Sequence, residues 1–327
     1  MILSVLKKRP RNSSVELLRI LSMTMIVMFH FCANAYRYNS ADFVCGHDSE
    51  TLIKLIFHAL GQTGVPVFMF ISGYYGIHFK KNRLIDIILQ CFVYIFLFYM
   101  VAHIFYPNGI GGELLILSAF CISGQWFMHA YITIYLFSDS INATLDKLSI
   151  RSFSALILVM MYISVGLWVY KESALNMFTL LEIYAVARYV RRFLSDMWKA
   201  RMVYLVFPSL LLFLLPVFYG WYAGNYSAIM PYVNKYYNPF ILIFAICLVV
   251  SAERFYFYNK CINYLASSVL ACYLIHTSFY FPPLVTSFFH FEKYNLSWIL
   301  LLSLMIVVGC SLVDKLRLYI QNKFINL

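Results

Sequence analysis

Long apolar runs separated by short polar segments dominate this sequence. Ten of the runs approach or exceed the roughly 20 residues that a helix needs to cross the hydrocarbon core of a bilayer. They are residues 15–35, 52–77, 84–106, 125–143, 153–170, 174–191, 202–222, 238–252, 262–282 and 297–313. Because the runs are continuous and lack the alternation of a membrane barrel, the pattern predicts an all-α, polytopic membrane bundle.

One further apolar stretch, 113–123, is too short to span the membrane, and we expect it to lie at the interface or to fold back. The predicted organisation is a single transmembrane domain over 15–313. A basic cytoplasmic segment, 1–14, precedes it, and a cytoplasmic tail, 314–327, follows it. No internal repeat or appended soluble domain is visible.

The amino-acid composition supports the membrane class. Of the 327 residues, 62% are hydrophobic and 12% are charged. That is about half the charged share of a soluble domain, and the mean hydropathy is +0.76. Too few charged residues are present to solvate a surface, so many apolar side chains must face lipid.

The net charge of +11 is distributed in short basic clusters between the apolar runs. With the N-terminus inside, 19 Lys and Arg residues fall in cytoplasmic segments and five outside, while Arg19 lies within the first span. Cytoplasmic loops carry the excess of Lys and Arg, so both termini are predicted to be cytoplasmic. A nucleic-acid partner would need one contiguous basic face and is not expected.

A cleavable signal peptide is an alternative for the N-terminus. Basic residues 7–11, an apolar stretch at 20–29 and a small-residue segment at 33–35 resemble one. Charged residues at the start of the stretch and His30 near its end interrupt the pattern, so we expect the helix to be retained.

The eight cysteines form no CxxC pair and no metal-ligand spacing. Most of them fall inside apolar runs, where a free cysteine behaves as a small hydrophobe. Only Cys32 and Cys45 are close enough in sequence, and near enough to one surface, for a disulfide. No metal site is expected.

Three ionisable residues lie in the first span, where charge is costly and therefore indicates function. Arg19 and His30 are eleven residues apart, so both project from one helix face about 16 Å apart along the axis. Glu16, three residues before Arg19, is within ion-pair reach. The alternative is that the Glu16–Arg19 pair reaches the inner interface and His30 only hydrogen-bonds a neighbouring helix.

Two other spans carry polar residues near their ends. Ser72-Gly73 comes at the cytoplasmic end of the second span, before Lys80, Lys81 and Arg83, where an anionic ligand such as a nucleotide phosphate could bind. The glycines fit close helix packing equally well. In the ninth span, His276 is predicted at a depth comparable to that of His30.

Four segments in this order resemble one known family. They are Arg19 and His30 with ten residues between them and Glu16 before them, Phe68-Met69-Phe70-Ile71-Ser72-Gly73-Tyr74, Gln125-Trp126-Phe127 with Tyr131 and Tyr135-Leu136, and Ser268 with Tyr273-Leu274-Ile275-His276. This pattern resembles the membrane acyltransferase-3 family. The resemblance implies an enzyme that O-acylates, usually O-acetylates, a carbohydrate at the outer face of the bacterial cytoplasmic membrane, with acetyl-CoA as donor. Its other partners would be the lipid bilayer and polysaccharide-assembly proteins.

The resemblance also implies roles for individual residues. Catalysis would fall to His30 and Arg19, with His276 orienting the acceptor or supplying a second proton-transfer step. The acetyl-CoA site would comprise Arg19, Ser72, Gly73, Lys80 and Arg83. The acceptor site would comprise Trp126, Tyr131 and Tyr273. Glu16 would form a structural ion pair with Arg19. His30 suits a general base, because its unperturbed pKa is near 6.5.

The sequence departs from the family pattern at Met69-Phe70-Ile71, where paired phenylalanines are usual, and the basic run after it is variable. No extracytoplasmic hydrolase-like domain is present, so direct transfer by the membrane domain is expected. A transporter or flippase of a lipid-linked sugar or small solute is the alternative function. Transporters usually show two related halves, and none is visible. An oligosaccharide polymerase would need a large outer loop.

Overall fold

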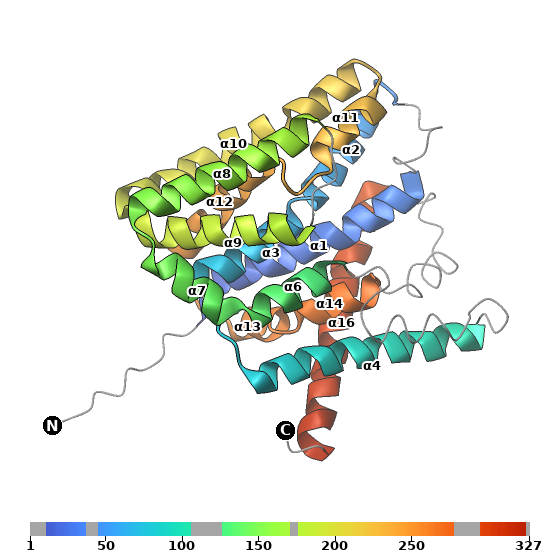
Figure 1. The fold of residues 1–327 in the computed structure, drawn as a ribbon. Helices are drawn as coiled ribbons and strands as arrows, with labels where there is room; N and C mark the ends of the chain where they lie inside the picture. Colours follow the sequence, from blue (N-terminus) through green and yellow to red (C-terminus); the bar gives the residue numbers. More distant parts are fainter. Residues whose placement is uncertain (1–10, 37–44, 106–125, 171–175, 278–294, 325–327) are drawn as a thin grey trace.

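The computed structural model describes residues 11–36, 45–105, 126–170, 176–277 and 295–324. Within these ranges the chain forms helices and no strand (Figure 1). The helices in the first half are α1 (Ser13–Tyr36), α2 (Ser49–Gly61), α3 (Gly64–Tyr75), α4 (Lys81–Phe105), α6 (Trp126–Leu136), α7 (Ser138–Lys147) and α8 (Ile150–Val169). Those in the second half are α9 (Asn176–Phe193), α10 (Asp196–Tyr222), α11 (Tyr226–Val233), α12 (Pro239–Arg254), α13 (Lys260–Ala266), α14 (Val269–His276) and α16 (Leu296–Phe324).

Six helical segments among the described residues are long and apolar enough to cross a membrane. They are Ser13–Ala33, Ser49–Tyr75, Lys81–Val101, Ile150–Val169, Asp196–Tyr222 and Leu296–Lys323. They coincide with the first, second, third, fifth, seventh and tenth predicted spans, and the all-helical class is confirmed. The total of ten spans and the cytoplasmic position of both termini stay predictions.

The other four predicted spans contain shorter helices. The run 125–143 is divided into α6 and α7, and the run 262–282 into α13 and α14. At each break a serine hydroxyl donates to a carbonyl three residues earlier, Ser138 at 2.7 Å and Ser267 at 2.8 Å. Such side-chain bonds compete with the helical ladder and favour its end. The stretch 113–123 lies outside the described residues.

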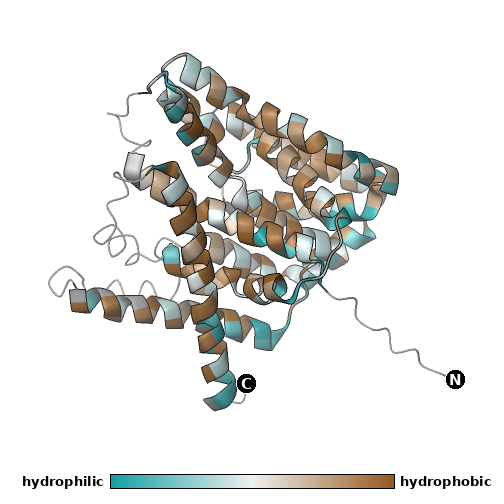
Figure 2. Ribbon diagram, turned by 180° about the vertical axis from the view of Figure 1, so that it is seen from behind, coloured by the Kyte–Doolittle hydropathy of each residue, from teal (hydrophilic) through white to brown (hydrophobic). Residues whose placement is uncertain are grey.

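Helix α1 and the α2–α3 pair occupy the centre of the bundle (Figure 1). In the apolar windows of these two spans 61% and 72% of the residues are buried, against 11% in α8 and 22% in α10. The outward faces of α8 and α10 are therefore largely apolar, and Figure 2 shows α10 as a long, mostly hydrophobic helix. A surface of this kind needs lipid as its solvent.

Glycines let α3 approach both α1 and α9 closely. A Cβ at Gly64 would lie 2.4 Å from Cγ1 of Ile26 on α1. A Cβ at Gly73 would lie 2.6 Å from the carbonyl oxygen of Tyr184 on α9. Small residues at helix contacts are the usual means of close packing in membranes, and here they fix α3 between two neighbours.

A buried polar cluster joins α4 to α16. The carboxylate of Asp314, which is 2% exposed, accepts hydrogen bonds from Gln90 at 2.9 Å, Tyr94 at 2.7 Å and the Arg317 guanidinium at 2.8 Å. Because α16 continues past Asp314, the predicted tail 314–327 is helical throughout its described part.

The packing of α3 against α9 can be tested by adding one methyl group. Gly73→Ala should lower stability by about 1–3 kcal/mol, the usual cost of overpacking, because the obstacle is backbone rather than a movable side chain. Thermal unfolding of the purified protein in detergent measures the change. Gly166→Ala is the matched control, since a Cβ there meets nothing within 4 Å. Equal midpoints for the two variants would contradict this packing.

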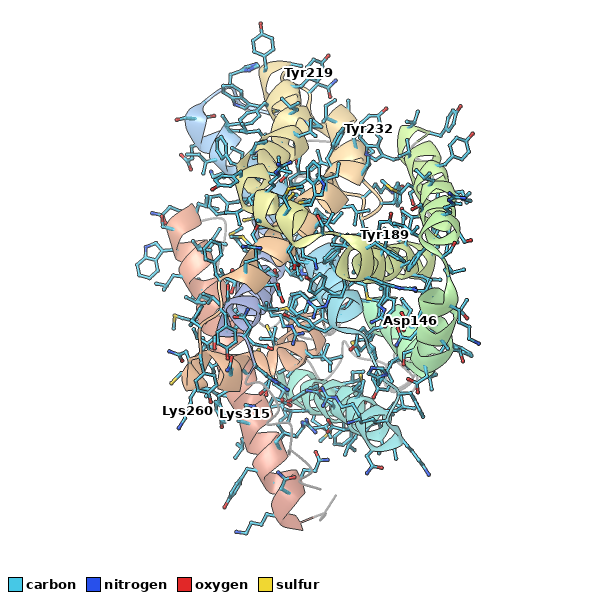
Figure 3. The ribbon with its side chains drawn as sticks, turned by 90° about the vertical axis from the view of Figure 1, so that its left-hand side faces the viewer. Asp146, Tyr189, Tyr219, Tyr232, Lys260 and Lys315 are labelled. Carbon is cyan, nitrogen blue, oxygen red and sulfur yellow. The ribbon has the colours of Figure 1, made fainter. Side chains whose placement is uncertain are left out.

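Reporter fusions test the orientation of the bundle. Figure 3 places Lys260 near one end of the molecule and Tyr219 at the opposite end. From the distribution of Lys and Arg, reporters fused after Arg192 and Lys323 should read cytoplasmic and a reporter after Lys235 should read external. A cytoplasmic signal after Lys235 would overturn the predicted orientation.

Candidate active site

Two cavities lie toward opposite ends of α1. The first, which we call the histidine cavity, has a volume of about 210 Å³ and is lined by Ile26, Phe29, His30, Gly61, Val65, Trp126, Tyr236, Tyr273, His276 and Thr277. The second, the arginine cavity, has a volume of about 450 Å³ and is lined by Arg11, Asn12, Val15, Glu16, Arg19, Tyr75, Arg191, Glu253 and Tyr256. Helix α1 contributes to both, so one element fixes the spacing between them.

The two histidines predicted at similar depth are in direct contact. Nδ1 of His30 lies 3.1 Å from Nε2 of His276, and Nδ1 of His276 lies 2.7 Å from the carbonyl oxygen of Cys272. Their rings tilt by 44° at a centroid distance of 5.1 Å. His276 comes from α14, in which seven of eight residues are buried. The contact therefore joins two rigid helices.

These contacts assign the protons on both neutral rings. A carbonyl oxygen only accepts, so Nδ1 of His276 carries a hydrogen and its Nε2 has a lone pair. The short nitrogen–nitrogen contact then needs a hydrogen on Nδ1 of His30. The remaining nitrogen of His30, Nε2, has a free lone pair and can accept a proton. This is the tautomer that a general base requires.

Aromatic side chains form much of the rest of the histidine cavity. The rings of Trp126 and Tyr236 lie 5.1 Å apart at 34°, and Tyr273 packs edge-on against Phe127 at 5.2 Å. Of the three residues predicted to bind the acceptor, Trp126 and Tyr273 therefore line this cavity. Tyr131 lies one turn farther along α6, stacked on Phe127 at 5.8 Å, and lines neither of the two cavities.

Sequence reasoning did not identify Tyr236. It lies in the short connection between α11 and α12, beside two other tyrosines at 232 and 237. Nothing in the sequence distinguishes the three. The Asn238-Pro239 step marks the start of α12 and is the only signal near them, and it locates the turn without showing which ring points inward.

The arginine cavity combines positive charge with exposed aromatic rings. Nη1 of Arg19 lies 3.4 Å from Glu16, and Nη1 of Arg191 lies 3.3 Å from Glu253. With Arg11, three guanidinium groups face two carboxylates, so the lining is net positive. Both ion pairs are long for charge-assisted hydrogen bonds, which are usually about 2.7–2.9 Å. Their arginines can therefore exchange a carboxylate for another anion.

The other residues predicted to bind the donor do not line the arginine cavity. Ser72 donates to the carbonyl of Phe68 at 3.0 Å, and Gly73 faces α9. The backbone N–H of Lys80 donates to the Tyr135 hydroxyl at 3.1 Å. Arg83 pairs with a neighbouring carboxylate at 2.6 Å. These contacts give the segment between α3 and α4 a structural role.

Arg11 and Arg191 line the arginine cavity together with Arg19. Sequence reasoning counted both as topology determinants, because each belongs to a basic cluster at a span end. Their convergence with Arg19 depends on the packing of α1 against α3 and α12, and of α3 against α9. No spacing within a single segment encodes it.

Two other predictions concern cysteines and metals. Cys32 and Cys45 are both free thiols, so the structure does not contain the disulfide considered for them. Among the described residues, no group of three or more His, Cys, Asp or Glu side chains could hold a metal ion.

Comparisons with known proteins identify the family. A family model described as an acyltransferase domain, Acyl_transf_3, matches residues 12–314. Searches of curated proteins and of solved structures gave no match. The matched region includes every residue that lines the two cavities except Arg11, and all of the described helices except the last turns of α16. The chain therefore belongs to the acyltransferase-3 family, and it is a multi-pass membrane acyltransferase.

Proposed function

We propose that this protein transfers an acetyl group from cytosolic acetyl-CoA to a hydroxyl of a cell-surface or lipid-linked polysaccharide. The proposed location is the bacterial cytoplasmic membrane. The observation that carries the proposal is the hydrogen bond between His30 and His276 inside a cavity. It leaves Nε2 of His30 as a free base, and deprotonation of an acceptor hydroxyl is the step that needs one.

The arginine cavity supports CoA as the donor. Guanidinium groups are always charged and bind phosphate oxygens in pairs, and CoA carries three phosphate groups. The volume of about 450 Å³ lies within the usual range for ligand sites. Tyr75 and Tyr256 are 46% and 56% exposed and offer ring faces on which the adenine could stack.

The spacing along α1 suits a donor with a long flexible arm. Arg19 and His30 are about 16 Å apart along the helix axis, from the helical rise. A CoA molecule held by its phosphates at Arg19 would extend its pantetheine arm along α1 and present the thioester at the histidine cavity. The nucleotide would then occupy the arginine cavity and the thioester carbon the histidine cavity, which agrees with the position of both cavities along α1.

The proposed reaction balances without any further group. Nε2 of His30 removes the hydroxyl proton as the acceptor oxygen attacks the thioester carbon. The new C–O bond forms, the C–S bond breaks, and the CoA thiolate takes the proton back from His30. His276 acts as a positioning residue, because its Nε2 holds Nδ1–H of His30 and so keeps the base in the reactive tautomer.

The overall function is tested with full-length protein in lipid nanodiscs. The substrates are acetyl-CoA and the surface polysaccharide of the producing cell, after mild base has removed its esters. We expect CoA release that depends on the polysaccharide, together with a mass increase of one acetyl unit that mild base reverses. Unchanged polysaccharide would contradict the proposal.

Arg19 should act through its planar guanidinium and not through charge alone. Arg19→Lys keeps the positive charge but loses the paired hydrogen bonds to phosphate, so acetyl-CoA binding should weaken and transfer should fall. Titration of acetyl-CoA into the nanodisc sample measures the binding. Lys199→Arg, at a position that lines neither cavity, is the control. Wild-type kinetics in a stable Arg19→Lys protein would assign Arg19 to the membrane interface.

His30 should be required for chemistry and not for binding or folding. His30→Ala and His30→Gln should each lower transfer by about two to four orders of magnitude, the usual effect of losing a general base. Acetyl-CoA binding should persist, because the phosphates are held at the other cavity. Steady-state transfer, binding and thermal unfolding are measured on the same samples.

His129→Gln is the matched control for this experiment, since His129 is exposed on α6. It should retain full activity. An active His30→Gln variant would show that hydrogen bonding suffices at this position. A His30→Ala variant that lost binding together with stability would likewise make His30 a packing residue.

A further inference from the structure

Acyl transfer needs hydrogen-bond donors in addition to a base. When an oxygen attacks a thioester, the carbonyl oxygen becomes an oxyanion, and preorganised donors at that position usually supply the largest single contribution to the rate. The histidine cavity must therefore offer N–H or O–H groups that are not already used within the protein. This inference rests on the proposed function.

Several polar groups that line the cavity already have partners. The Thr277 hydroxyl donates to the carbonyl of Tyr273 at 2.6 Å. Tyr273 therefore accepts this bond through its backbone, not through its hydroxyl. His30 and His276 hold each other. The Thr277 hydroxyl and the two histidines therefore use their hydrogens within the protein.

Of the donors that remain, two lie side by side. The indole N–H of Trp126 and the hydroxyl of Tyr236 have no hydrogen-bond partner among the described residues, although both rings are largely shielded from solvent. The rings contact each other at a centroid distance of 5.1 Å. Both line the same cavity as His30. Partly buried donors without partners are unusual, because desolvation is costly, and a ligand that accepts from both would satisfy them.

The connection that carries Tyr236 is held in place. Asn238, which is fully buried, donates from its side chain to the carbonyl of Tyr232 at 2.9 Å and accepts from the backbone N–H of Phe240 at 2.9 Å. The backbone N–H of Asn238 donates to the carbonyl of Lys235 at 3.0 Å. These bonds close a turn around Tyr236, so its hydroxyl is positioned before a ligand arrives, as a stabilising donor must be.

We propose that the Tyr236 hydroxyl and the Trp126 indole N–H form the oxyanion-binding site for the tetrahedral intermediate. As the acceptor oxygen bonds to the thioester carbon, the carbonyl π electrons move to the carbonyl oxygen. The two donors hydrogen-bond that oxygen and keep their protons. When the carbonyl re-forms, the C–S bond breaks and the thiolate takes its proton from His30. Tyr236 is then a catalytic residue.

Removing the hydroxyl alone tests this role. Tyr236→Phe keeps the ring and its contact with Trp126, so the fold should persist. Loss of one oxyanion donor should lower kcat by about 100- to 1,000-fold with unchanged KM for the polysaccharide. Trp126→Phe, which removes the N–H group, should have a comparable effect. The assay is the nanodisc reaction with acetyl-CoA and de-esterified polysaccharide.

Hydrolysis of acetyl-CoA without polysaccharide separates this role from acceptor binding. The oxyanion also forms when water attacks, so Tyr236→Phe should lower hydrolysis by the same factor as transfer. A hydroxyl that only binds the sugar, or an aromatic pair that only stacks on it, would leave hydrolysis unchanged, and that result overturns the proposal. Wild-type transfer in either Phe variant also overturns it.

Tyr237→Phe is the matched control. This neighbouring tyrosine lies in the same connection and, like Tyr236, lines a small cavity beside Glu182. It does not line the histidine cavity, so the transfer rate of the variant should stay at the wild-type level. Failure of this inference and failure of the proposed function give different results. If the wild-type protein does not acetylate the polysaccharide, the function fails. If it does so and Tyr236→Phe is equally active, only the oxyanion site fails.

Discussion

The hydrogen bond between His30 and His276 is the contact on which the arrangement of the site depends, because it fixes α1 against α14 at one end. At the other end of α1, Ser13 is also held by the C-terminal part of the chain. Its hydroxyl accepts from the backbone N–H of Asn259 at 2.7 Å, and its backbone N–H donates to Phe257 at 2.9 Å. Helix α1 is thus attached near both ends to residues more than 240 positions away. This attachment leaves little freedom for its tilt or rotation, and hence for either cavity.

Features that lie within one segment could be predicted from the sequence, and features assembled from several could not. The helical period alone places Arg19 and His30 on one face, and the depth of a span end relates His276 to His30. The Ser-Gly pair beside basic residues after the second span was predicted to bind the donor, and these residues line neither of the two cavities. In the structure Gly73 is the place where α3 meets α9, and steric contact explains the glycine.

The breaks within two of the predicted spans could not be predicted from hydropathy either. Hydropathy does not register the serine hydroxyl bonds that divide α6 from α7 and α13 from α14. If successive spans cross the membrane in opposite directions, Arg19, Tyr75 and Arg191 are all predicted on the cytoplasmic side, and these three residues line one cavity. His30 and Trp126 are predicted on the outer side, and both line the other cavity. The packing is therefore consistent with the predicted order of crossings.

The placement of two unlike cavities along one straight helix has a consequence for how material would cross the bilayer. In the proposed reaction only an uncharged acetyl group would traverse the membrane, while the polyanionic carrier would stay among arginines on the side from which it came. Free CoA would return directly to the pool that supplies it. The protein would need neither a coupled ion gradient nor an alternating change of access. Its direction would be set by the difference in chemical stability between a thioester and an oxygen ester.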